Sequence, residues 1–170
     1  VALAVPLAAR IGKKGAFAAA MGAAAVLSLF FFRLEPSELG WLFALQALVS
    51  VAAGVVLPLL WSMYADIVDY EEYRSGRRPT GLIFSSSSMS QKLGWALGGA
   101  VTGWLLAAFG YDQSAAVQSG EAIAGVRLMM SWFPAAGCLL AAAAVLFYPL
   151  GEKRMERITT ELNLRRKTNE

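Results

Sequence analysis

The chain has 170 residues, of which 57% are hydrophobic and 16% are charged, and its mean hydropathy is +0.52. Soluble domains hold about 25% charged residues, and the apolar residues here fall in long blocks, so the composition indicates a membrane protein with several spans. The net charge of +3 does not indicate a nucleic-acid partner, because the basic residues flank apolar blocks, where membrane topology places them.

The composition also excludes several kinds of chemistry. Histidine is missing, and the single cysteine, Cys138, lies inside an apolar block. This argues against a disulfide framework, a Cys/His metal site and histidine acid–base catalysis. No nucleophile–base pair, phosphate-binding loop or metal cluster is recognisable, so we expect neither enzyme activity nor a cofactor or resident metal.

The predicted elements are all helices. Residues 1–8 are expected to be the end of a membrane helix that begins before the sequence does. Four apolar blocks follow, each near or above the ~20 residues that cross a bilayer. Their approximate bounds are 15–32, 39–63, 81–109 and 125–150. The expected fold is an all-α membrane protein with four complete transmembrane helices plus the end of a fifth (1–150), followed by a tail (151–170).

The connecting segments predict the orientation. Basic residues gather in 9–14, 64–80 and the tail, whereas 33–38 and 110–124 hold only Arg33, with Arg127 just beyond. The positive-inside rule places the three basic segments in the cytoplasm. In the tail, three apolar residues share a helical face, which is typical of a short amphipathic helix. Two alternatives stay open for this tail: its basic residues rest on lipid headgroups, or it is solvated. These residues are Met155, Ile158 and Leu162.

Lys92 is the first candidate functional residue. It lies eleven residues after Gly81, about 16 Å along a helix and close to the middle of a ~30 Å hydrocarbon core. A charge at that depth costs roughly 2.5–3.5 kcal/mol and usually serves a function. Ser85 and Ser88 lie on the same helical face, and Gln91 lies beside it. We expect this face to line a polar cavity that contacts substrate or ion; a structural ion pair is the alternative.

Two further side chains are weaker candidates for the same pathway. Trp95 lies one turn beyond Lys92 and could stack on a sugar ring, or simply pack against lipid or another helix. Gln46 could hydrogen-bond a ligand, or bridge helices.

The segment 64–80 predicts a gate. Asp66 and Asp69 lie one turn apart on one helix face. Without histidine or a third ligand they do not make a metal site. We expect an ion-pair network at the cytoplasmic mouth that breaks when the mouth opens. The residues assigned to this gate are Arg10, Asp66, Asp69, Tyr70, Glu72, Arg77 and Arg78.

Residues 64–111 resemble a known family. Their A-D-x-V-D-Y-x-E-x-x-x-G-x-R run, the serines and the Q-K-L-G that contains Lys92 are similar to the loop between the tenth and eleventh helices, plus the eleventh helix, of the glycoside–pentoside–hexuronide:cation symporters. These are the melibiose-permease-like members of the major facilitator superfamily. PLAARIGKK (6–14) is similar to the loop before the ninth helix, although Ala9 stands where the superfamily motif has Asp.

The resemblance implies the C-terminal part of a twelve-helix transporter. Such carriers couple sugar or glycoside uptake to Na⁺ or H⁺ by alternating access. It also implies that Lys92 lies close to the cation and sugar sites, and that the cation ligands lie on an N-terminal six-helix half, which would be the partner of this chain. The expected location is the plasma (inner) membrane, with a cytoplasmic C-terminus.

Two other functions stay open. The same fold could carry a non-sugar solute such as a lipid. Alternatively, the chain could be a small membrane scaffold that does not transport, with Lys92 in a structural ion pair.

Overall fold

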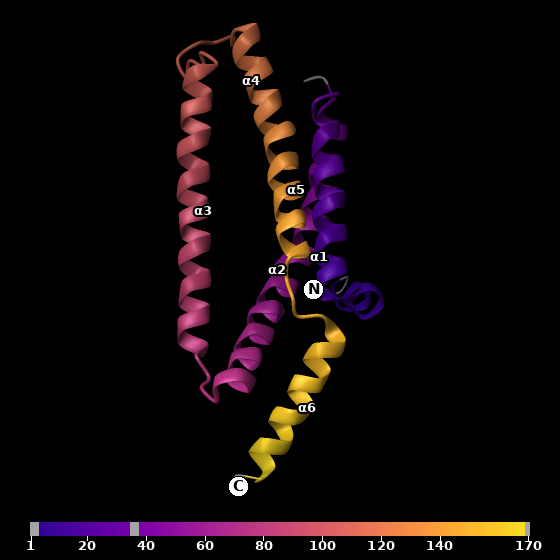
Figure 1. The fold of residues 1–170 in the computed structure, drawn as a ribbon. Coiled ribbons are helices and arrows are strands. Elements are labelled where there is room, and N and C mark those ends of the chain that lie inside the picture. The colour runs from indigo at the N-terminus through magenta and orange to yellow at the C-terminus, as the bar shows by residue number, and fades with distance from the viewer. Residues whose placement is uncertain (1–3, 35–37, 169–170) are drawn as a thin grey trace.

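The computed structural model describes residues 4–34 and 38–168, and the regular structure of these residues is helical. The helices are α1 (Ala4–Phe30), α2 (Leu39–Ser75), α3 (Thr80–Ala108), α4 (Gly120–Met130), α5 (Trp132–Leu146) and α6 (Glu152–Thr168). Figure 1 shows α1, α2 and α5 crossing beside one another, with α3 standing apart and α6 below them. We call the end that carries residues 10–14, 66–80 and α6 the basic end.

α1 contains a sharp turn at Gly12. This residue has φ 78° and ψ 158°, a left-handed conformation that glycine adopts without steric cost. The part before Gly12 therefore turns sideways from the rest of α1 (Figure 1). We expected a loop at 9–14 between separate helices at 1–8 and 15–32. Instead, helical structure continues up to and beyond Gly12, and residues 1–3 lie outside the described residues.

α2 is longer than the predicted 39–63. It begins at Leu39 and continues to Ser75, because no glycine or proline interrupts residues 64–75. Its 37 residues rise about 55 Å, well beyond a ~30 Å hydrocarbon core. Gly76 ends the helix with φ 71°, and its N–H donates to the carbonyl of Glu72 at 2.9 Å. The predicted connection 64–80 is therefore helical up to Ser75.

The last predicted span, 125–150, is in fact two helices. α4 already begins at Gly120, where the Ser119 hydroxyl accepts a hydrogen bond from the Ala122 N–H at 3.1 Å. The helix breaks at Ser131, whose φ is −115° and ψ −75°. The cause is Pro134, which has no N–H for the carbonyl of Met130 and whose ring clashes with that carbonyl. The Ser131 hydroxyl donates to the Arg127 carbonyl at 2.6 Å and stabilises the break.

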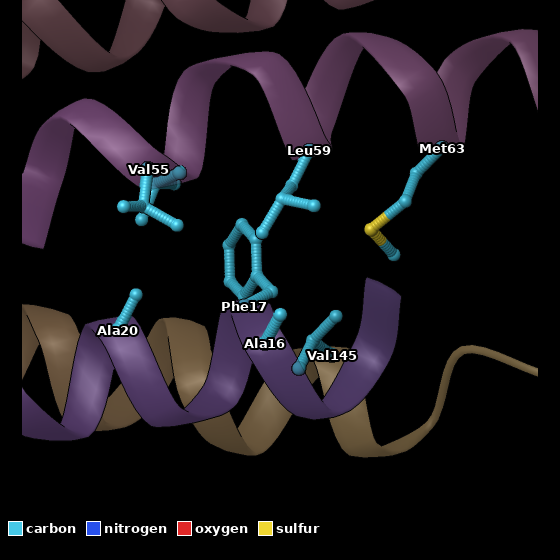
Figure 2. Close-up of a cluster of buried hydrophobic side chains, with 8 residues drawn as sticks. Ala16, Phe17, Ala20, Val55, Leu59, Met63 and Val145 are labelled. Atoms are coloured by element: carbon cyan, nitrogen blue, oxygen red, sulfur yellow. The ribbon is translucent and has the colours of Figure 1, made fainter. Parts of the chain in front are cut away.

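A small apolar core joins α1 to α2 and α5 (Figure 2). Ala16 and Ala20 present little side chain, so α2 approaches α1 closely and Phe17 packs beside Leu59. Met63 extends this core toward the basic end. Each large side chain that is fully buried stabilises the fold by about 1.5–3 kcal/mol.

Three described helical stretches are long and apolar enough to cross a membrane: Val5–Phe30, Leu39–Ser75 and Gly120–Leu146. α3 has 29 residues, but its serines, Gln91 and Lys92 make it less apolar than these three. Large apolar side chains face outward, including Phe43 (74% exposed) and Trp104 (75% exposed). Such an exposed apolar surface is typical of contact with lipid or with other helices.

α6 packs against the basic end of α2. Met155, Ile158 and Leu162 are buried, which confirms that they share one face. That face is buried because it packs on the α2 side chains Tyr70 and Tyr73. The predicted tail is therefore a helix bound to the bundle.

Candidate functional site

Lys92 lies in a groove on the surface of α3. The groove has a volume of 540 Å³, and all the side chains that line it come from α3. Ser85, Ser88 and Lys92 line it together, since residues at i, i+3 and i+7 share a helical face. Lys92 is exposed, and in the described part of the chain its ammonium forms neither an ion pair nor a hydrogen bond. The groove can therefore offer a positive charge to a ligand or to another helix.

The neighbouring serines differ in their availability. The hydroxyls of Ser86 and Ser87 donate to backbone carbonyls of α3 at 2.7 Å, and that of Ser85 does so at 3.1 Å. Such bonds satisfy a hydroxyl within its own helix. Ser88 makes no hydrogen bond to the residues that the structure describes, so its hydroxyl is the free polar group nearest to Lys92 on this face.

The other predicted pathway residues do not line this groove. Gln91 is half-buried next to it, and Trp95 is 77% exposed on its flank. Gln46 is exposed on α2 and is not brought to Lys92. A role for these three side chains in transport stays a prediction.

An aromatic cluster fixes α3 to α2, and the sequence interpretation missed it. Phe84 stacks on Trp61 with ring centroids 5.7 Å apart and meets Tyr64 edge-on at 6.3 Å. Trp61 and Tyr64 also meet edge-on, at 5.8 Å. Such aromatic pairs contribute about 0.5–1.5 kcal/mol beyond their burial. The cluster therefore sets the position from which α3 presents Lys92.

A first ion pair joins α1 to α2 at the basic end. The Lys13 ammonium donates to both carboxylate oxygens of Asp66, at 2.7 and 2.8 Å. The turn at Gly12 directs the chain so that Lys13 reaches α2. Lys14, on the same turn, donates to the carbonyl of Leu146 at 2.5 Å and so caps the last turn of α5. Neither lysine was among the predicted gate residues.

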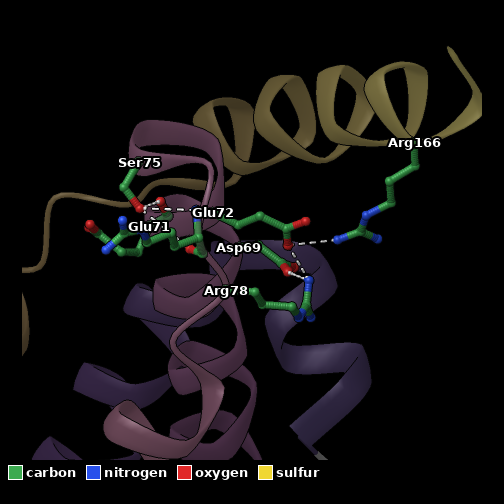
Figure 3. A network of polar contacts seen from close by, with 7 residues as sticks. Asp69, Glu71, Glu72, Ser75, Arg78 and Arg166 are labelled. Carbon is green, nitrogen blue, oxygen red and sulfur yellow. Dashed lines mark hydrogen bonds and ion pairs between the residues drawn. The ribbon is translucent and has the colours of Figure 1, made fainter. Parts of the chain in front are cut away.

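A second polar network joins α2, the 76–79 connection and α6 (Figure 3). The Arg78 guanidinium pairs with Asp69 at 2.9 Å and also with Glu72. Arg166 of α6 reaches the same Glu72 oxygen at 2.8 Å. The hydrogen bond to Glu72 is the main cause that raises the pKa of Arg78, and the charge of Asp69 adds to it.

Two more contacts bind α6 to this network. Arg154 lies 5.1 Å from the ring centre of Tyr70, and Arg165 lies 5.0 Å from that of Tyr73. These are cation–π contacts, worth about 0.5–1 kcal/mol each at exposed sites. These partners could not be recognised from the sequence, because Arg154 lies 84 residues after Tyr70 and Arg165 lies 92 residues after Tyr73.

Two predicted gate residues lie outside these contacts. Arg10 lines a cavity of 790 Å³ between the turn at Gly12 and α6, but it forms no ion pair within the described residues. The backbone of Arg77 contacts the Ser75 hydroxyl, and its side chain forms no ion pair there either. The described residues also contain no group of three acidic, Cys or His side chains that could hold a metal ion.

Comparison with known proteins identifies the family. The family described as MFS/sugar transport protein matches residues 1–152. The chain belongs to this family. MFS/sugar transport proteins are transporters rather than enzymes. With three apolar spans and this family membership, the chain is a multi-pass membrane protein of the glycoside–pentoside–hexuronide symporter group.

Three relatives in this family illustrate the similarity. The glucuronide carrier protein homologue of Escherichia coli (strain K12) is 34% identical over 162 residues, which are 95% of this chain and 35% of the relative. The inner membrane symporter YicJ of the same organism is 33% identical over 139 residues, 81% of this chain and 30% of the relative. The isoprimeverose transporter of Lactiplantibacillus pentosus is 43% identical over 98 residues, 58% of this chain and 20% of the relative.

The chain thus spans about a third or less of the length of these relatives. No solved structure is similar to it at a significant level.

Proposed function

We propose that this chain forms the C-terminal part, with four membrane helices and the end of a fifth, of a carrier that couples sugar or glycoside uptake to Na⁺ or H⁺ by alternating access. The observation that carries the proposal is the groove of α3, where Lys92 and Ser88 present an ammonium and a hydroxyl with no partner among the described residues. A lone charge on a long helix of a sugar-transport family suits a substrate or ion pathway.

The remaining helices of the carrier would complete this site. α3 has no buried residue in the described structure, so its polar groove and its apolar faces are open to further contacts. In this proposal α3 is a fourth membrane span, its groove faces an N-terminal six-helix half, and lipid covers other apolar faces. The coupling cation would bind mainly to that half.

The ion pairs at the basic end would act as a gate. Their side chains are partly exposed, from 13% for Asp66 to 49% for Arg166. Exposed ion pairs contribute only about 0–1 kcal/mol each, so thermal motion can break them one after another when the mouth opens. We place this end in the cytoplasm of a cell whose inner membrane holds the carrier, in agreement with the positive-inside rule.

Uptake measurements test the proposal. Cells that produce the carrier containing this chain are given labelled glycosides, a labelled glucuronide and a labelled lipid, with and without Na⁺ and a proton gradient. We expect accumulation of at least one sugar only when a cation gradient is present. Accumulation of the lipid alone would favour a non-sugar carrier, and no uptake of any solute by a well-inserted protein would favour a scaffold.

A further inference from the structure

A narrow apolar groove lies at the end of the bundle opposite the basic end. Its volume is 320 Å³, at the lower limit of ligand pockets. The turn after α1, the first turn of α2, the connection before α4 and α4 itself form it. Its apolar lining includes Phe31, Leu42, Ile123 and Met130. It is separate from the Lys92 groove, and the transport pathway proposed above does not use it.

Arg127 is the charged side chain that lines this groove. It is half-buried inside the apolar stretch Gly120–Leu146, and its guanidinium has no ion pair or hydrogen bond among the described residues. None of the residues that line the groove is acidic. A charged side chain within a membrane span is costly and marks a site with a partner of opposite charge. The unpaired guanidinium therefore calls for an anion.

The dimensions of the groove fit a lipid. From Ala122 to Met130 the lining follows α4 for eight residues, about 12 Å, close to the ~15 Å depth of hydrocarbon in one leaflet. Helical side chains lean toward the N-terminus of their helix, so Arg127 leans toward the start of α4 and toward the membrane surface at that end. A long apolar chain along the groove would thus carry its head near Arg127.

We propose that this groove binds an acyl chain of an anionic phospholipid and that Arg127 pairs with the phosphate of its headgroup. A sugar offers no long apolar part to such a lining. A zwitterionic lipid offers a phosphate that its own ammonium already neutralises in part. Binding should therefore favour a headgroup of net negative charge.

Competition between two lipids tests this proposal. The carrier that contains this chain is purified in detergent, given equal amounts of phosphatidylglycerol and phosphatidylcholine with identical acyl chains, and examined by native mass spectrometry. We expect the complex with one phosphatidylglycerol to be about 10-fold or more as abundant as the complex with one phosphatidylcholine. The reason is that a hydrogen bond between two charged groups is stronger than one between neutral groups. Equal retention of the two lipids by the unmodified chain would overturn the proposal without any variant.

Three variants locate the lipid. Arg127→Gln should abolish the preference, whereas Arg33→Gln should keep it, because Arg33 lies near the same end but does not line the groove. Val126→Trp should fill the groove and reduce the retention of both lipids while Arg127 remains. Circular dichroism and size-exclusion chromatography confirm that each variant is folded. A preference that survives Arg127→Gln, or a Val126→Trp chain that still holds the lipid, contradicts the proposal.

Discussion

At the residue scale, the partners of each polar group decide which side chains are available for function. The three hydroxyls of Ser85, Ser86 and Ser87 are used within α3, whereas Ser88 and Lys92 find no partner among the described residues. The sequence showed that Lys92 and two serines share a face. It could not show which hydroxyl is satisfied, because that depends on side-chain rotamers.

Gly125 gives a prediction at this scale. A Cβ atom at this position would lie 2.3 Å from the ring of Phe109 and 2.6 Å from its Cβ, so the end of α3 would have to move away from α4. Gly125→Ala should therefore destabilise the chain by about 1–3 kcal/mol, the usual cost of overpacking. Thermal melting in detergent measures this loss.

A matched control for this prediction is Gly137→Ala, since a Cβ there would meet open space. We expect it to leave the melting temperature unchanged or slightly raised, because alanine favours a helix over glycine. Equal melting temperatures for the two variants would contradict the packing of Phe109 on Gly125.

At the element scale, the sequence predicted where helices lie better than where they end. The bounds of α3 (80–108) agree with the predicted 81–109, because Pro79 and Gly110 flank a long apolar run. The continuation of α2 from Met63 to Ser75 was not predicted as part of this membrane helix, because the charged residues of 64–75 end the apolar run, although no glycine or proline interrupts them. The break at Ser131 was also missed, although Pro134, four residues after Met130, was the signal that could have located it.

The attachment of α6 gives a prediction at this scale. Ile158 is 4% exposed, so its burial stabilises the contact between α6 and α2 by about 1.5–3 kcal/mol. Ile158→Asn should remove most of this free energy, so that α6 separates from α2 about 10 to 100 times more often. Hydrogen exchange of residues 152–168 should accelerate accordingly. Thr159→Asn places the same side chain at the exposed neighbouring position and should have little effect. Similar exchange in the two variants would show that this apolar face does not hold α6.

At the scale of the whole molecule, α1 packs against both α2 and α5, while α3 stands apart from α1 and α5 (Figure 1). At the basic end, α6 packs against α2. The alternation of basic segments predicted that residues 9–14, 64–80 and the tail share one end, and the structure brings residues of all three segments together there. The individual partners were not predictable. Lys13 reaches Asp66 only because Gly12 turns the chain, and Arg166 reaches Glu72 only because α6 folds back onto α2.

Lys92 is the residue on which the proposed transport pathway depends most. The most direct test is cation-driven uptake of a labelled glycoside by cells that produce the carrier with Lys92→Ala or, as a control, Lys153→Ala. Lys153 is an exposed lysine of α6 that forms no ion pair with the described residues. At equal amounts of inserted protein, Lys92→Ala should lower uptake about 10-fold or more, since it removes a charged partner of the ligand, while the control should transport normally. Undiminished, cation-dependent uptake by Lys92→Ala would contradict this account.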